Sequence, residues 1–311
     1  MNFSYLNNQV YPGHNVPLKP KVSVCLITYA HENYLDTCLQ NILNQEVDFS
    51  YEIVIGEDCS PDKTAEIVKR YAEQFPEKIK AFIRPQNAGA KINFVHCFFE
   101  CQGEYIVHIE GDDYWTDPQK LQKQIDFLEA NPDYVLCFHQ IRILKTDGSM
   151  VDDFLTKVPE NCETIETLAK FGNYIHTPSV VYRNVLSKFP FEFEKTPIGD
   201  YFLYMMLAEH GKLKYMEEMM AVYRYGIGIL TSQNSIKITI DQIRFYSCLL
   251  SYLNEEHLKS IFLERQYLAI DRFLRFTEYH FTSNRFLAEK KSLFDLIKIA
   301  LIKVYNKFKY E

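Results

Sequence analysis

VSVCLITYAHENYLDTCLQNILNQ, residues 22–45, contains the pattern that decides the fold. Val22–Thr28 is a short, almost continuous apolar run, which is typical of a strand buried on both faces of a sheet. A polar turn follows, and the next residues place apolar side chains on one face of a helix: Leu35, Cys38, Leu39, Ile42 and Leu43. The segment therefore predicts a strand followed by a helix.

The same alternation continues along the chain. We expect further strands at Tyr51–Gly56, Ile79–Ile83 and Tyr105–Ile109. Helices are expected at three places: after a cap at Ser60 or Asp62, over Asn93–Cys101, and with Pro118 at the first helical position. Strands that alternate with helices predict an α/β fold with a mixed, mainly parallel sheet flanked by helices.

The later part of the sequence changes character. Strand-like runs dominate from about residue 135 to about residue 235, and amphipathic helical runs follow to residue 311. We expect a lead-in over residues 1–20, one α/β domain over residues 21–235, and a helical extension over residues 236–311.

Composition limits the function classes. A hydrophobic content of 47% and a charged content of 24% are typical of a folded globular protein. The formal net charge of −7 argues against nucleic acid as a partner, because phosphate contacts need clustered basic side chains. We find no signal peptide and no apolar run long enough to span a membrane, and none of the eight cysteines forms a CxxC pair, so we expect a cytoplasmic protein.

Polar side chains gather where three of the predicted strands end. These ends carry Thr28-Tyr29, Glu57-Asp58, and Glu110 with Asp112 and Asp113. Ligands of open α/β sheets bind beyond the carboxyl ends of the strands, so the three ends predict one binding site.

The acidic stretch IEGDDYW, residues 109–115, points to the chemistry of that site. Carboxylate oxygens close together are the ligands of hard divalent cations such as Mg²⁺ or Mn²⁺, and a short ligand set leaves positions open for water and phosphate. The alternative is a loop whose acidic side chains cap the following helix and face water.

Several motifs in order resemble family 2 glycosyltransferases. They are the opening segment, then EIVIGEDCSPDKT, RPQNAG and GEYIVHIEGDDYW, and together they cover roughly residues 20–235. EGDDYW followed by KLQKQIDFL is similar to the branch that builds bacterial surface polysaccharides. The resemblance implies the GT-A fold, with a nucleotide-sugar half over about 21–134 and an acceptor half over about 135–235.

The resemblance also implies an activity. It would be a metal-dependent, inverting, hexosyltransferase-type transfer of a sugar from a UDP-sugar donor to a hydroxyl of a glycan acceptor, carried on a lipid at the inner face of the membrane. Two rivals stay open: a sugar nucleotidyltransferase, which TYAHENYL disfavours because it lacks the glycine-rich phosphate loop, and a non-catalytic nucleotide-binding scaffold.

Donor-site roles follow from the resemblance position by position. Thr28, Tyr29 and Glu32 match the segment that lines the nucleobase and ribose. Asp58 matches the carboxylate that accepts the uracil imide N–H, and the less favoured alternative is a helix-capping turn. Lys91 lies near the usual diphosphate contact, and a solvated surface lysine is an equal alternative.

The same resemblance implies metal and catalytic residues. Glu110 and Asp112 occupy the two acidic positions of the DxD motif, with Asp112 expected to bind the metal and Glu110 the ribose or a metal-bound water. Asp113 is a second candidate ligand. Asp200, in TPIGDYFLYMML, matches the base that deprotonates the acceptor hydroxyl, and its alternative is helix capping.

The chain departs from the family pattern in the turn next to Asp58 and in the segment whose histidine often assists the metal or diphosphate. Glu57 and Cys59 stand where an Asp and a Gly are usual, and the YRxH segment reads YRYG at residues 223–226, without its histidine. Trp115 and His176 lie where the resemblance places an acceptor sugar, while His176 could equally be a packing residue.

The C-terminal tail is basic. From Arg285 onward it holds seven basic and three acidic residues, a net charge of 7 − 3 = +4. Lysines interleave with large apolar residues there, as in a helix that lies on a membrane surface. Packing on its own domain, or on a second subunit in a homodimer, is an equal alternative.

Overall fold

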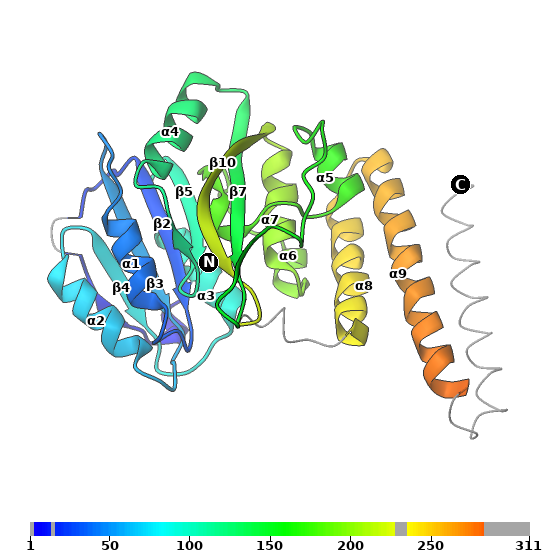
Figure 1. The fold of residues 1–311 in the computed structure, drawn as a ribbon, viewed down its shortest axis with the longest axis horizontal. Coiled ribbons are helices and arrows are strands. Elements are labelled where there is room, and N and C mark those ends of the chain that lie inside the picture. Colours follow the sequence, from blue (N-terminus) through cyan, green and yellow to red (C-terminus); the bar gives the residue numbers. More distant parts are fainter. Residues whose placement is uncertain (1–2, 14–15, 228–234, 283–311) are drawn as a thin grey trace. The chain divides into compact units, whose positions relative to one another are not determined.

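The computed structural model describes residues 3–13, 16–227 and 235–282 (Figure 1). The chain divides into two compact units. The first consists of Met1–Lys188 with Tyr204–Thr231, and the second of Phe189–Leu203 with Ser232–Glu311. The segment Phe189–Leu203 thus groups with the C-terminal helices. The predicted boundary between residues 235 and 236 had placed this segment in the α/β domain.

The first unit is built on one mixed sheet in the order β1-β4-β3-β2-β5-β9-β7-β10-β6, with β8 paired to β7. Its strands are β1 (Gln9–Tyr11), β2 (Val22–Thr28), β3 (Tyr51–Glu57), β4 (Ile79–Ile83), β5 (Tyr105–Glu110), β6 (Tyr114–Trp115), β7 (Tyr134–Leu144), β8 (Met150–Asp152), β9 (Val181–Arg183) and β10 (Lys212–Arg224). The block β4-β3-β2-β5 is parallel, as is the β7–β10 pair, and the other pairings are antiparallel. The predicted fold class is confirmed.

The register of the parallel block brings the polar strand ends together. Every residue of β2 is buried, as its apolar run predicted. Thr28 pairs with Glu57 of β3, and Ile27 pairs with Glu110 of β5. The chain runs from β2 to β3 and β4 on one side and then returns to β5 on the other, so the strand order reverses at β2, where α/β sheets bind ligands.

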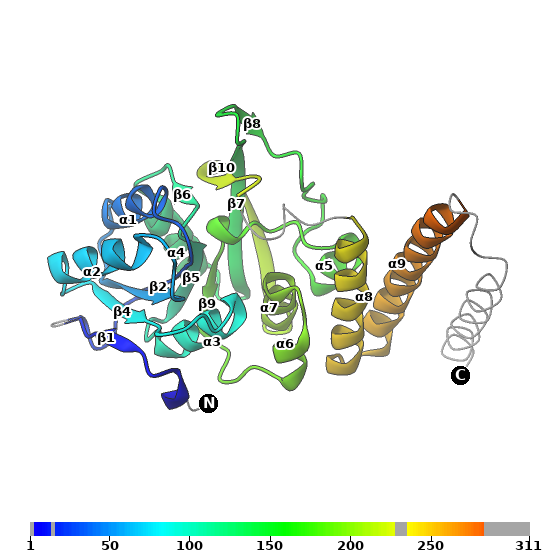
Figure 2. The same cartoon turned by 90° about the horizontal axis from the view of Figure 1, so that it is seen from below.

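Helices cover both faces of the parallel block (Figure 2). The helices of the first unit are α1 (Leu35–Leu43), α2 (Thr64–Gln74), α3 (Ala90–Glu100), α4 (Lys120–Ala130) and α5 (Ile165–Phe171), with short 3₁₀ turns η1 (Ser4–Leu6) and η2 (Thr177–Ser179). The views place α1, α2 and α4 on one face and α3 on the other.

Two helix starts differ from the prediction. α3 begins at Ala90, three residues before the expected Asn93. Pro118 is not the first helical residue of α4, because it lies in a turn and the helix begins at Lys120. Asp62 does serve the start of α2: its Oδ1 accepts hydrogen bonds from the N–H of Thr64 at 3.0 Å and from that residue's hydroxyl at 2.6 Å.

The second unit contains α6 (Phe191–Lys195), α8 (Ser235–Tyr252) and α9 (Glu256–Thr282), and α7 (Gly199–Ala208) begins in it. Aromatic rings form its core: Tyr201 stacks on Phe245 with ring centroids 4.8 Å apart, and Phe202 meets Phe193 edge to face at 5.7 Å. The described helices include none that is long and apolar enough to cross a membrane. The basic tail from Arg285 lies outside the described residues.

Lys120 is a buried lysine close to Trp115, the last residue of the IEGDDYW stretch. Its side chain is fully buried, its Nζ donates to Gln124 Oε1 at 2.7 Å, and it lies 4.4 Å from the centroid of the Trp115 ring. Burial lowers the pKa of Lys120 to about 7. Because this folded-state pKa is below the unfolded value, the unfolded chain binds more protons above about pH 7, and stability rises with pH there.

We expect a difference in pH dependence between wild type and Lys120→Met. From pH 7 to pH 10 the wild-type free energy of unfolding should rise by about 3 kcal/mol relative to the variant, which has no lysine to deprotonate at this site. Urea denaturation at each pH measures it. Lys188→Met, at an exposed lysine of the same unit, should follow wild type. If the free energies of unfolding of wild type and Lys120→Met changed in parallel with pH, the lowered pKa of Lys120 would be contradicted.

Candidate functional site

The site is built around Asp112 and Asp113, which follow the end of β5. Both are buried, with 4% and 1% of their surface exposed. Gly111 allows the chain to turn here: a Cβ on it would lie 2.7 Å from Thr28 Oγ1 and 2.9 Å from His31 Nδ1. Because Gly111 has no side chain, the acidic turn can pack directly against the end of β2.

A guanidinium lies beside these carboxylates. The backbone N–H of Arg224, the last residue of β10, donates to Asp113 Oδ1 at 2.9 Å, and its side chain donates to the backbone oxygen of Asp112. The guanidinium also lies over the rings of Tyr34 and Tyr114, with distances of 5.0 and 4.6 Å to the centroids. Part of the positive charge that the acidic cluster needs is thus supplied by the protein, from the YRYG segment that lacks the family's histidine.

The two aspartates have different electrostatic environments. Burial and the neighbouring Asp112 hold the pKa of Asp113 well above its ordinary value. Asp112 Oδ1 is buried and has no hydrogen-bond partner within the described residues. A buried carboxylate oxygen without a donor is costly unless a cation or a ligand N–H or O–H reaches it.

The carboxylates of Asp112 and Asp113 fit a hard divalent ion whose remaining ligands come from water and the substrate. The described residues contain no group of three or more His, Cys, Asp or Glu side chains that could hold a metal by themselves. Mg²⁺ is usually bound by one or two carboxylates together with water and substrate phosphates. Asp112, with its unpartnered oxygen, matches that arrangement, and Asp113 lies beside it.

His31 is a site residue that the sequence reasoning did not select. Its Nδ1 lies 3.2 Å from Thr28 Oγ1, and its Nε2 lies 3.8 Å from Asp112 Oδ2. Burial lowers the pKa of His31 and outweighs the opposing effect of Asp112. The sequence gives no signal for this role, because no local spacing links His31 to an aspartate 81 positions later (112 − 31 = 81).

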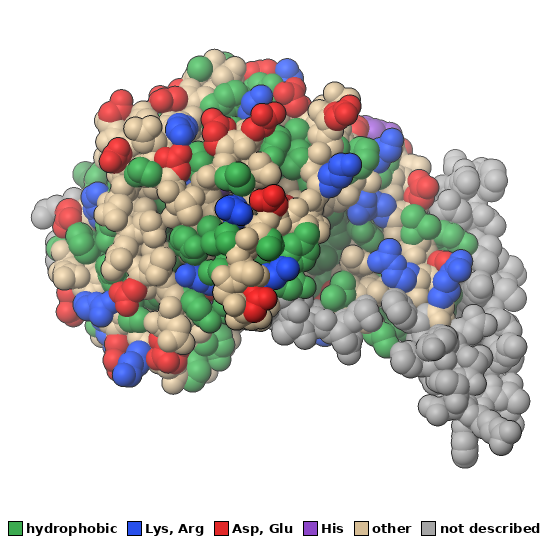
Figure 3. Space-filling model, viewed as in Figure 1, with side chains coloured by type: hydrophobic (Ala, Val, Ile, Leu, Met, Phe, Trp, Pro, Cys, Tyr) green, Lys and Arg blue, Asp and Glu red, His purple; other side chains and the backbone are tan. Residues whose placement is uncertain are grey.

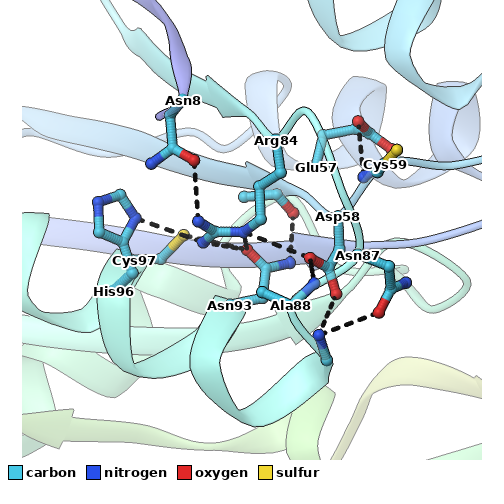
Figure 4. A network of polar contacts seen from close by, with 12 residues as sticks. Asn8, Glu57, Asp58, Cys59, Arg84, Asn87, Ala88, Asn93, His96 and Cys97 are labelled. Atoms are coloured by element: carbon cyan, nitrogen blue, oxygen red, sulfur yellow. Dashed lines mark hydrogen bonds and ion pairs between the residues drawn. The ribbon is translucent and has the colours of Figure 1, made fainter. Parts of the chain in front are cut away.

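Asp58 is the centre of a second buried network (Figure 4). Its Oδ1 and Oδ2 accept hydrogen bonds from the N–H groups of Ala88 and Gly89 at 2.8 and 2.9 Å. Arg84 Nε lies 3.4 Å from Oδ1, and the guanidinium of Arg84 also donates to Asn93 Oδ1 at 2.7 Å. Asp58 therefore fixes the loop that leads into α3, and Arg84, which the sequence reasoning did not select, supplies its counter-charge.

The turn after β3 accounts for two departures from the family pattern. Cys59 has φ of +60°, a conformation that favours the glycine usually found there. The longer side chain of Glu57 holds this turn, because its two oxygens accept the N–H groups of Cys59 at 3.2 Å and Ser60 at 2.7 Å. Glu57 thus takes a structural role next to Asp58.

The other predicted donor-site residues surround these two networks. Tyr29 is 42% exposed at the end of β2, so its ring is open to a ligand. Glu32 accepts the N–H of Lys63 at 3.0 Å and is part of the β2–α1 loop. Glu110 ends β5, and Lys91 is the second residue of α3.

The predicted acceptor residues are placed differently from one another. Trp115 is 1% exposed and donates from Nε1 to the Pro178 oxygen at 3.0 Å, so it offers no open face to a sugar ring and serves as packing. His176 is part of a cavity in the first unit, next to Asp153. Asp200 belongs to the second unit, in the first turn of α7.

Two proteins of known sequence are similar in sequence to part of this chain. Rv1520, an uncharacterized protein of Mycobacterium tuberculosis, is 34% identical over 203 residues, which are 65% of this chain and 58% of that protein. TuaG of Bacillus subtilis, provisionally named as a teichuronic acid biosynthesis glycosyltransferase, is 29% identical over 137 residues, 44% of this chain and 53% of TuaG. The chain thus spans less than two thirds of the length of these relatives.

Solved structures share the fold. S. aureus TarS (residues 1–349), solved with UDP-GlcNAc, aligns with a TM-score of 0.60 and 17% identity, covering 93% of this chain and 81% of that one. The mannosyltransferase PcManGT of Pyrobaculum calidifontis, solved with GDP-Man and Mn²⁺, aligns with a TM-score of 0.56 and 16% identity, covering 95% and 85%. The family model for glycosyl transferase family 2 matches residues 23–189, more than half of the chain. This chain belongs to glycosyl transferase family 2.

Proposed function

We propose that the protein is an inverting glycosyltransferase that moves a sugar from a UDP-sugar to a hydroxyl of a glycan acceptor. The observation that carries the proposal is the buried Oδ1 of Asp112, which has no hydrogen-bond partner among the described residues and lies at the carboxyl edge of the sheet beside Arg224. An oxygen in this position needs a cation, and a nucleotide diphosphate that shares the cation would lie across the strand ends.

A uridine donor is favoured by two observations. TarS, which shares the fold, has been solved with UDP and with UDP-GlcNAc, whereas PcManGT was solved with GDP-Man. Asp58, directly after β3, accepts the Gly89 N–H at Oδ2, which leaves a lone pair on that oxygen, whereas Oδ1 accepts the Ala88 N–H and lies 3.4 Å from Arg84 Nε. It can accept the imide N–H of uracil, while the exposed ring of Tyr29 stacks on the base.

Asp112, with Asp113 beside it, would hold Mn²⁺ or Mg²⁺, which when bound neutralises charge on the diphosphate. Arg224 keeps the backbone of Asp112 and the carboxylate of Asp113 in place. His31, near Asp112 Oδ2, positions the same side chain from the β2–α1 loop. Asp200, in the first turn of α7, takes the proton from the acceptor hydroxyl. The hydroxyl oxygen attacks the anomeric carbon of the donor from the face opposite UDP, and the bond from that carbon to the diphosphate oxygen breaks, so UDP leaves.

Surface polysaccharide synthesis is the pathway class we propose for the acceptor, because TuaG bears a name from teichuronic acid biosynthesis. A lipid-linked glycan at the inner face of the membrane is consistent with the basic composition of residues 285–311. Acidic and basic side chains are interspersed among the described residues on the face in Figure 3. Membrane contact or homodimer formation through residues 285–311 is proposed from their composition.

Asp58→Asn should weaken UDP binding by about ten- to a hundredfold, because the substitution removes a charged acceptor. Calorimetric titration with UDP measures the effect. Asn87→Ala, which removes a neighbouring acceptor of the Gly89 N–H but leaves Asp58 in place, serves as the control and should stay within a fewfold of wild type. Unchanged UDP affinity in Asp58→Asn would show that Asp58 only holds the loop.

Nucleotide release from a panel of UDP-, GDP- and CMP-sugars, with Mn²⁺, with Mg²⁺ and with EDTA, tests the function itself. We expect slow, metal-dependent release of UDP from one UDP-sugar, faster when the correct acceptor is added. Pyrophosphate-dependent formation of nucleoside triphosphate would instead indicate a nucleotidyltransferase. UDP binding without turnover, even with acceptor glycans present, would indicate a scaffold.

A further inference from the structure

A cavity of about 180 Å³ lies in the first unit, between β7, β10 and the segments after β8 and α5. Seven of its lining residues carry polar groups: His139, Gln140, Asp153, Thr156, Tyr174, His176 and Tyr215. At about 30 Å³ per water molecule the space holds roughly six waters, which is similar to one sugar ring. Only His176 among these residues was selected from the sequence.

His139 gives the cavity an unmet hydrogen-bonding need. Its side chain is 2% exposed, and its Nδ1 lies 2.8 Å from the backbone oxygen of Gln140, so Nδ1 carries the proton that makes this bond. Burial and the nearby Lys120 hold the pKa of His139 well below its ordinary value, so the ring is neutral. Its Nε2 is then an acceptor, and it has no partner within the described residues.

The strand pairing is irregular at the same place. His139 of β7 pairs with Met216 of β10, but the next residue, Gln140, pairs with Met219. Two extra residues, Glu217 and Glu218, are therefore inserted in β10 opposite this point. Bulges of this kind redirect side chains and are common next to binding sites.

The Asp153–His176 pair determines which ligands the cavity disfavours. Asp153 accepts four hydrogen bonds: from the N–H groups of Leu155 and Thr156, from the Thr156 hydroxyl, and from Nε2 of His176 at 2.9 Å. Burial alone would raise the pKa of Asp153, but these hydrogen bonds outweigh it and lower the pKa to about 2. The cavity thus contains a fixed negative charge, which disfavours phosphate and carboxylate groups.

A ligand for this cavity must donate hydrogen bonds and carry no negative charge. Sugar hydroxyls meet both conditions, and the half-buried ring of Tyr215 offers an apolar face to the C–H groups of a sugar. We propose that the cavity binds a neutral sugar ring of the acceptor glycan, with one ring hydroxyl donating to His139 Nε2. That the ring belongs to the acceptor rests on the proposed function.

Saturation-transfer NMR with methyl glycosides of glucose, galactose, mannose, N-acetylglucosamine and glucuronic acid tests the proposal. Wild type is compared with His139→Phe and with Val158→Phe, which narrows the cavity from a half-buried lining position and keeps His139. His210→Phe, at an exposed histidine of the same unit, is the matched control. UDP binding is measured on the same samples by calorimetry.

We expect a neutral glycoside to bind wild type and the control, and to bind each cavity variant at least about tenfold more weakly while UDP affinity is unchanged. Water alone in the cavity, shown by no saturable binding of any neutral glycoside, would overturn the proposal. So would unchanged binding in both variants, or a preference for the glucuronide. If wild type did not bind UDP, the proposed function would be refuted. The glycoside result would be judged separately, because it does not depend on UDP.

Discussion

Asp112→Asn is expected to lower the rate of UDP release from the preferred donor about a thousandfold. The asparagine keeps the shape of the side chain but removes the charge that holds a cation against the diphosphate, and losing one such electrostatic contact typically costs a hundred- to a thousandfold. A coupled assay for UDP, run at saturating Mn²⁺ with donor alone and with acceptor, measures the loss.

The control for this substitution is Asp126→Asn, which makes the same chemical change at an exposed position of α4. It should retain wild-type activity. If Asp112→Asn kept more than about a tenth of the activity, the unpartnered oxygen of Asp112 would not be the metal ligand, and Asp113 would have to be examined in its place.

Asp200→Asn should reduce sugar transfer by about a hundred- to ten-thousandfold while leaving UDP affinity unchanged. An amide cannot take a proton from the acceptor hydroxyl, and general-base catalysis contributes factors of this size. A general base accepts a proton only in its ionised form, so the acidic limb of the pH–rate profile should disappear in the variant.

A purely structural role for Asp200 predicts something different. Asparagine caps a helix about as well as aspartate, so in that case Asp200→Asn would leave the melting temperature, the transfer rate and the shape of the pH–rate profile close to those of wild type. Glu255→Gln, an equivalent change at an exposed acid of the second unit, is the matched control. Partial recovery of transfer in Asp200→Glu would support the base, whereas equal transfer by wild type and Asp200→Asn would exclude it.

The parallel half of the sheet could be predicted from the sequence because its strands are buried on both faces. β2 and β4 begin and end where their apolar runs do, and β3 and β5 each extend one residue further, to Glu57 and Glu110. Burial on both faces removes the polar alternation that makes strand limits ambiguous. The helix starts were less predictable, since Pro118 is compatible with a preceding turn as well as with a first helical position.

The networks around the carboxylates could not be read from the sequence. Arg224 reaches Asp112 and Asp113 only because β10 ends beside β6 and the acidic turn. Arg84 reaches Asp58 because β4 is parallel to β3, and no local spacing indicates this. Long-range pairs of this kind depend on strand order, whereas the strand ends that carry the carboxylates follow from the local apolar runs.

Trp115 and His139 show the same limit for side-chain environment. A tryptophan after an acidic turn is compatible with a sugar platform, but pairing of β6 with β10 buries it. His139 lies in a mostly apolar strand, but the bulge in β10 opposes it and its Nε2 is left without a partner in the described part of the chain. Burial of single side chains is set by neighbouring strands, which the sequence does not order.

Calorimetric titration of UDP into wild type and Asp112→Asn, each with Mn²⁺ and with EDTA, tests the central claim most directly. We predict that UDP binds wild type with Mn²⁺ and at least about tenfold more weakly with EDTA, and that Asp112→Asn binds weakly under both conditions. UDP affinity that is the same in all four titrations, or no UDP binding by wild type with Mn²⁺, would contradict a metal-assisted donor site at Asp112.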